Sequence, residues 1–185
     1  MKFSAILGSL IAVQAAVVPS NLFGAIAKDM TTFNRLTELL PVGEKLIYSG
    51  NAEGTQNYVC VEGKYVLDFA EALLISMNAV PYKRDSVHHY FLDKAVAIDG
   101  ARPTWKYDAD GSIISGKALI KKDDPNPKNI QWLKVGITQH TGNTGFFSNV
   151  KTVLRVNTDG GVPPATCTGN STAQVNYKTD YLFFQ

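Results

Sequence analysis

Apolar and polar residues alternate along most of the chain with the period of two that is typical of β-strands. The clearest run ends the chain, where one face carries Ala173, Val175, Tyr177, Thr179, Tyr181 and Phe183. About eight short runs of this kind, separated by turn signals, predict an antiparallel β-sandwich or barrel. We therefore expect a mainly β, single-domain fold, an antiparallel β-sandwich or barrel, and assign residues 41–185 to the β-sandwich domain.

Residues 21–40 follow a different period. Apolar side chains recur every three to four positions, which predicts a helix; they are Leu22, Ile26, Met30, Phe33, Leu36 and Leu40. Thr32 is a candidate N-cap, and Pro41-Val42-Gly43 ends the run. Residues 17–40 are interpreted as a short N-terminal helical arm or as a pro-segment that is removed later, and the sequence leaves both open.

Residues 103–116 predict a β-hairpin. Trp105 and Tyr107 share one face, Asp110-Gly111 favours a tight two-residue turn, and Ile113 begins the returning strand. Gly50 to Gly54 is also predicted to be a turn.

Two further stretches are ambiguous. The segment from Phe69 to Met77 fits either a strand pair or a short helix. Between residues 130 and 138 the apolar positions change parity, which predicts a bulge or twist in one strand.

Composition limits the classes of partner. Of 185 residues, 45% are hydrophobic and 18% charged, which suits a folded domain with a real core. The net charge is +2 and no run of Lys or Arg exceeds two residues, so nucleic acid is not an expected partner. We expect a monomer.

The N-terminus has the pattern of a secretory signal peptide. Lys2 precedes an apolar run from Ala5 to Val18, and Val13 and Ala15 supply small residues before a cleavage site after Ala15 or Ala16. The alternative is a buried N-terminal helix. We assign residues 1–16 to the signal peptide and expect no transmembrane segment, so the protein should be secreted, either extracellular or at the cell wall.

Two cysteines suit an exported protein. Cys60 and Cys167 are an even count, which predicts one disulfide, with two free thiols as the alternative. Asn170-Ser171-Thr172 is an acceptor sequence for N-glycosylation at Asn170.

Several short motifs resemble one known family in order and spacing. They are residues 50–60, Pro103-Thr104-Trp105, Asp110-Gly111-Ser112, Trp132-Leu133, residues 150–155, Thr158 to Gly161, Pro163-Pro164, Cys167 and Tyr177-x-x-x-Tyr181. Together they resemble the domain of unknown function 3455 family, a secreted and mainly fungal and bacterial group. The resemblance implies an exported β-rich domain with Cys60 paired to Cys167, and it implies no established activity. One departure is an insertion between His89-Tyr90-Phe91 and Arg102-Pro103-Thr104-Trp105.

Motifs for cofactor chemistry are incomplete. The malate dehydrogenase label that members of that family carry lacks support, because the candidate Gly142-Asn143-Thr144-Gly145 leads into another predicted strand and not into a helix. Lys106 and Lys117 occupy the first and last ligand positions of a would-be calcium loop. His88 and His89 are adjacent on a predicted strand and point to opposite faces, so we expect no metal and no cofactor.

Five residues are the candidate binding positions: His89, Trp105, Tyr107, Asp108 and Asp110. Their rings form either a sugar-stacking platform or, as aromatics on strands more often do, part of the core. The preferred hypothesis is a non-enzymatic domain that binds a cell-wall polysaccharide or a surface protein. The alternatives are a secreted hydrolase with its site near His89, Asp108 and Asp110, and an extracellular effector that binds a host protein.

Overall fold

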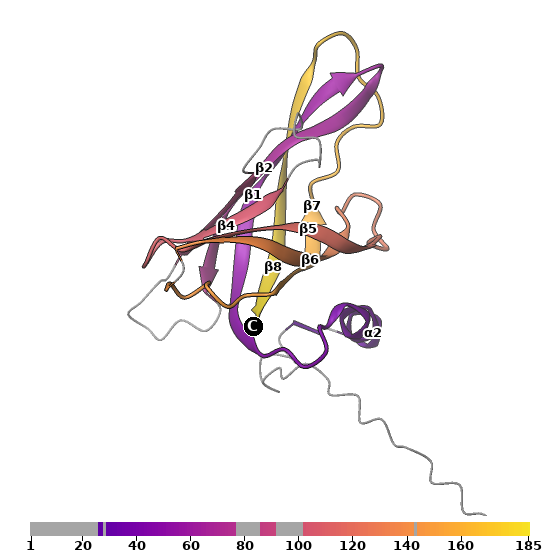
Figure 1. Cartoon of the computed structure of the whole chain (residues 1–185). Helices are drawn as coiled ribbons and strands as arrows, with labels where there is room; N and C mark the ends of the chain where they lie inside the picture. Colours follow the sequence, from indigo (N-terminus) through magenta and orange to yellow (C-terminus); the bar gives the residue numbers. More distant parts are fainter. Residues whose placement is uncertain (1–25, 28, 77–85, 92–101, 143) are drawn as a thin grey trace, which may run out of the picture.

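A computed structural model of the chain describes residues 26–27, 29–76, 86–91, 102–142 and 144–185. The described residues form eight antiparallel strands that close into one barrel, in which β8 returns to pair with β1 (Figure 1). The strands are β1 (Leu46–Val61), β2 (Lys64–Ser76), β3 (Ser86–Phe91), β4 (Pro103–Tyr107), β5 (Ile113–Lys122), β6 (Trp132–Thr141), β7 (Thr152–Gly160) and β8 (Thr172–Phe184). The mainly β prediction is confirmed. Of the two architectures predicted for residues 41–185, a sandwich or a barrel, the structure has the barrel. The description of this domain as a sandwich is wrong, because pairing is continuous around one closed sheet.

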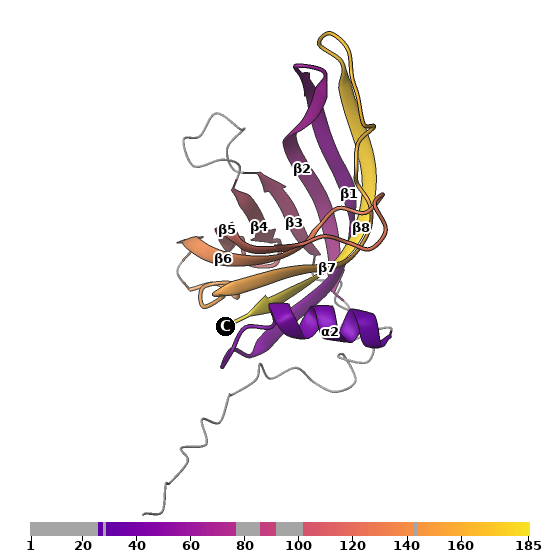
Figure 2. The ribbon, with the colours of Figure 1, turned by 90° about the vertical axis from the view of Figure 1, so that its right-hand side faces the viewer.

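Three long strands project beyond the rest of the barrel. β1, β2 and β8 have 16, 13 and 13 residues, and Figures 1 and 2 show them rising together as an arm. Cys60 near the tip is joined to Cys167 in the loop before β8, with the two Cα atoms 5.8 Å apart, which confirms the predicted disulfide. Asn170 is exposed in the same loop.

The turn predicted at Gly50 to Gly54 is wrong. β1 runs straight through these residues and pairs with β2 on one side and β8 on the other. The glycines serve close packing within the sheet, since a β-carbon at Gly50 would lie 3.0 Å from the Tyr48 ring. On the facing strand, the ambiguous segment up to Ser76 is a single strand, β2, and Met77 lies outside the described residues.

The β4–β5 hairpin is confirmed, but its turn is longer than the predicted two residues. The loop spans residues 108–112 and is closed by the Tyr107 N–H donating to the Ser112 carbonyl at 2.9 Å. The Asp110 carboxylate causes the difference, because it accepts from the N–H of Ser112 at 2.8 Å and from the N–H of Phe146 at 2.5 Å. The loop is thereby tied to the segment before β7.

One helix, α2 (Met30–Leu39), packs on the outside of the barrel (Figure 2). Its N-cap is Asp29 and not Thr32, because an Asp29 Oδ1 atom accepts from the Thr32 N–H at 2.7 Å. Leu36 and Leu39 are buried, whereas Met30 is 71% exposed, so the buried stripe lies at the C-terminal end of the helix. This helix is too short to span a membrane, and no other described helix is long enough.

The helix explains the change of parity in β6. Trp132 faces outward into the cluster beneath α2, whereas Leu133 and Val135 face the barrel interior. Both faces of this strand are therefore apolar. The predicted irregularity is also present, because the register between β5 and β6 shifts between Ser115 and Gly116 and again between Ala118 and Ile120.

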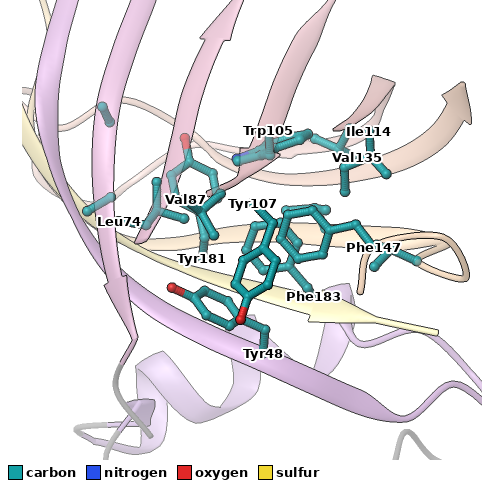
Figure 3. Packing of buried hydrophobic residues seen from close by; sticks show 14 of the residues in the cluster. Tyr48, Leu74, Val87, Trp105, Tyr107, Ile114, Val135, Phe147, Tyr181 and Phe183 are labelled. Carbon is teal, nitrogen blue, oxygen red and sulfur yellow. The ribbon is translucent and has the colours of Figure 1, made fainter. Parts of the chain in front are cut away.

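Aromatic side chains fill part of the barrel interior. Tyr48, Tyr107, Phe147 and Phe183 form the packed group visible in Figure 3. The Phe147 and Phe183 rings stack with centroids 4.8 Å apart, and Tyr48 meets Phe183 edge-on at 5.4 Å. We call these four residues the aromatic plug. The signal peptide predicted at 1–16, and Leu22 of the predicted helix, lie outside the described residues.

Candidate binding cavity inside the barrel

All eight strands contribute side chains to one cavity of about 950 Å³. Its inner wall is buried and includes Gln56, His89, Trp105 and Tyr181. Its outer wall is exposed, as at Lys117 and other residues of β5 and of the loop at 123–131, so the cavity opens to solvent at that side. The residues of the aromatic plug do not line it. The cavity is thus the part of the barrel interior that the plug leaves unfilled.

Three rings form the floor of the cavity. His89 on β3 lies opposite Trp105 on β4, and their rings stack with centroids 5.0 Å apart and planes 19° apart. Tyr181 on β8 completes the group, with its ring 5.4 Å from His89 and 5.7 Å from Trp105. Trp105 also meets Phe183 of the plug at 5.9 Å, so the floor rests on a packed base (Figure 3).

His89 is a neutral ring with a fixed tautomer. Its Nδ1 lies 2.9 Å from the Thr104 carbonyl oxygen, which can only accept, so Nδ1 carries the proton and Nε2 is left as an acceptor. Burial lowers the pKa of His89 to about 4 against the opposing effect of the Thr104 hydrogen bond, and the charge of Arg155 lowers it further. The side chain is 3% exposed.

Phenol groups surround this floor. Burial raises the pKa of Tyr58 to about 12, and its hydroxyl donates to the Gly161 carbonyl at 2.6 Å. Burial also raises the pKa of Tyr181 and that of the adjacent Tyr177, so all three are neutral hydroxyls at ordinary pH. Tyr177 and Gln56 are both 2% exposed, and neither the Tyr177 hydroxyl nor the Gln56 Nε2 has a hydrogen-bond partner of good geometry among the described residues.

Arg155 on β7 brings a positive charge to the cavity wall. It lies directly opposite Tyr181 in the β7–β8 ladder, so the two side chains share the inward face. Its Nε and Nη2 both donate to the Gln131 carbonyl, at 3.1 and 2.8 Å. This pair of hydrogen bonds fixes the guanidinium to the loop that forms the rim.

Helix α2 holds that rim loop in place. Arg35 donates to the Asp123 carbonyl at 2.6 Å, lies 3.8 Å from the Asp124 carboxylate and covers the Trp132 ring with its guanidinium carbon 4.4 Å from the centroid. Asp124 in turn accepts from the Trp132 Nε1 at 3.0 Å. Helix α2 therefore acts on the cavity as well as on the outer core.

The structure separates the five candidate binding residues. His89 and Trp105 line the cavity, whereas Tyr107 is part of the aromatic plug. Asp108 lies 3.2 Å from the ring of exposed His88, and Asp110 organises the β4–β5 loop. The His89, Asp108 and Asp110 group suggested for a hydrolase is therefore not assembled in one cleft.

Sequence reasoning missed Gln56, Tyr58 and Arg155. The available signal was a charged residue within an otherwise apolar run, Val153-Leu154-Arg155-Val156. Among the residues that the structure describes, no group of three or more His, Cys, Asp or Glu side chains is placed to hold a metal ion.

The fold and the cavity define a class of protein: a small, closed, antiparallel β-barrel with a ligand-sized space inside. Within that class, the chain belongs to the family described as protein of unknown function (DUF3455), whose model matches residues 41–185. The family resemblance expected from the motifs is confirmed. Comparison with curated proteins and with solved structures found no significant match.

Proposed function

We propose that this protein is an extracellular binding protein that holds a small organic molecule inside its barrel. The observation that carries the proposal is the cavity of about 950 Å³ lined from all eight strands. Ligand pockets are typically about 300–1,000 Å³ and mostly apolar, with a few placed polar groups. Eight-stranded barrels are wide enough to enclose one small ligand. The partly exposed apolar side chains of Leu67, Phe91 and Leu133, together with the polar group of Arg155, match that pattern.

Export is supported by three separate features. Residues 1–16 have the signal-peptide pattern. The Cys60–Cys167 disulfide suits an oxidising compartment, and Asn170 is exposed beside it, where glycosylation is sterically open.

Binding is favoured over catalysis by the separation of His89 from Asp108 and Asp110. A polymer-binding platform is less well supported, since Trp105 is 1% exposed and Tyr107 is also buried. Polysaccharide and surface-protein partners, and an effector role, stay predictions that pull-down on cell walls and on host extracts addresses.

Fluorescence titration with the neutral dye Nile red tests the proposal. We expect saturable binding with enhanced emission. Ala118→Trp, on the cavity wall, should weaken binding about tenfold or more because the indole takes up ligand space. Leu119→Trp is the matched control, since Leu119 is the next residue, is exposed and does not line the cavity. Absence of saturable binding, or equal loss in both variants, would contradict a binding site inside the barrel.

A further inference from the structure

The charge of Arg155 is not neutralised by a carboxylate among the described residues. Its guanidinium donates to the backbone carbonyl of Gln131 and also contacts the Tyr181 hydroxyl, but no acidic side chain of the described chain forms an ion pair with it. A half-buried guanidinium on the wall of an apolar cavity is unusual, because partly desolvated charges are normally paired. The guanidinium also retains N–H donors beyond the two that bind Gln131.

The two acidic residues on the cavity wall are engaged elsewhere. Asp123 accepts from the Gln131 Nε2 at 2.6 Å. Asp124 accepts from Trp132 Nε1 at 3.0 Å and from Asn129 Nδ2 at 3.2 Å, and Arg35 lies beside it. Both carboxylates hold the rim loop together, so the local charge at Arg155 stays positive.

Apolar side chains with accessible surface line the cavity beside Arg155. Leu67, Phe91 and Leu133 are partly exposed on its wall, and Leu133 lies directly opposite Arg155 in the β6–β7 ladder. His89, Trp105 and Tyr181 are at most 3% exposed, since they pack on one another. The arrangement places an accessible apolar surface beside the positive charge of Arg155.

We propose that the cavity binds a small hydrophobic carboxylic acid as its anion, with the carboxylate on Arg155 and the apolar part against Leu67, Phe91 and Leu133. This inference rests on the proposed function, since it names the class of ligand for the same cavity. A guanidinium matches a carboxylate with two parallel hydrogen bonds, which adds geometric selectivity to charge.

Isothermal titration calorimetry with 2-naphthoate and its neutral analogue 2-naphthamide tests the inference. The two probes share one ring system and differ in charge. For the wild type at pH 7 we expect naphthoate to bind at least about tenfold more tightly. Arg155→Gln should remove that preference by weakening naphthoate about tenfold or more, with little change for naphthamide. Arg155→Lys keeps the charge and should retain part of the preference if the Gln variant fails to fold.

Lys106→Gln is the matched control, because Lys106 is an exposed cation on β4 that does not line the cavity. It should leave the preference for naphthoate within about twofold, since exposed charges are screened by solvent. Equal affinity for the two probes overturns the anion assignment and leaves the cavity as a binding site. If neither naphthoate nor naphthamide binds although Nile red does, the anion assignment is also overturned. If Nile red does not bind either, the proposed function itself is overturned.

Discussion

Gly54 on β1 lies directly opposite Ala72 on β2, and the two strands approach so closely there that no side chain fits at position 54. A β-carbon on Gly54 would lie 2.6 Å from both the Cα and the Cβ of Ala72, and it would also collide with the Glu71 carbonyl oxygen. Because the obstructing atoms include backbone, the strands themselves would have to separate. This contact lies where β1 passes from the barrel into the arm. It therefore fixes the spacing of β1 and β2 at that point.

Gly54→Ala should therefore destabilise the protein by about 2–3 kcal/mol, the upper part of the range for overpacked sites. Urea unfolding monitored by circular dichroism measures the change. Glu53→Ala is the control, because Glu53 is the preceding residue and forms an exposed ion pair with Lys178. Its effect should stay below about 1 kcal/mol. Equal stability of the Gly54 variant and the wild type would contradict the close approach.

The same glycine shows why part of the fold was misjudged from sequence. Glycine marks a turn or a close backbone approach, and only the partner strand distinguishes the two. The local alternation predicted β8 and the β4–β5 hairpin correctly, since each has one apolar face. The closure of the barrel depends on pairing between β1 and β8, which are far apart in the chain, and no local pattern encodes that pairing.

The candidate site was predicted in part for a similar reason. His89 and Trp105 were predicted as candidate binding residues, since both carry functional side chains and lie close together in the family motif. They do meet across β3 and β4. The sequence did not identify Arg155 and Gln56 as site residues, because whether a polar side chain faces solvent or the barrel interior depends on the curvature of the sheet. Both faces of β7 are apolar, because one packs beneath α2 and the other faces the barrel interior. Alternation along the strand therefore does not show which face points inward.

Helix α2 should contribute to stability through its C-terminal turn. Leu39 is fully buried in the outer cluster with Trp132 and Leu154. Leu39→Ala should destabilise the protein by about 2–4 kcal/mol, from lost apolar burial and the cavity left behind. Met30→Ala is the matched control, since Met30 is on the same helix and exposed, and its effect should be below about 0.5 kcal/mol. Denaturant unfolding compares them, and equal small effects would indicate that the helix is dispensable, as a removable pro-segment requires.

Acid should destabilise the protein through His89. The pKa of this ring falls from 6.5 to about 4 on folding, chiefly because of burial. Between pH 6.5 and about pH 4, the unfolded chain binds a proton at His89 that the folded state does not bind. The free energy of unfolding therefore falls as the pH drops through this range. The shift corresponds to roughly 3 kcal/mol. The loss of unfolding free energy between pH 7.5 and pH 4 should be smaller in His89→Asn than in the wild type, by roughly 3 kcal/mol.

His88→Asn is the control for this experiment, because His88 is the adjacent residue and its side chain is largely exposed beside Asp108. Its acid-induced loss of stability should be close to that of the wild type. An identical pH dependence in the His89 variant and the wild type would show that His89 is not buried in its neutral form.

Removal of the disulfide should weaken the whole domain. Cys60 and Cys167 are 107 positions apart in sequence, and in the chain-entropy model a loop of that size contributes about 4–5 kcal/mol by restricting the unfolded chain. The double variant Cys60→Ser/Cys167→Ser should lose about that amount in denaturant unfolding. Reductant should lower the stability of the wild type toward that of the double variant and leave the double variant unchanged. Insensitivity of the wild type to reductant would contradict a stabilising bridge.

Maturation in a secretory host should leave two covalent marks. The small residues Val13 and Ala15 predict cleavage after Ala15 or Ala16 and so a mature N-terminus at Ala16 or Val17, and the exposed Asn170 should carry a glycan in a eukaryotic host. Intact mass spectrometry of protein from the culture medium should show both, and Asn170→Gln should remove the glycan mass without reducing secretion much. Asn176→Gln is the control, because Asn176 lies on β8 outside any acceptor sequence and should keep the glycan. Retention of residues 1–16, with the protein found inside the cell, would contradict the export on which the proposed extracellular role depends.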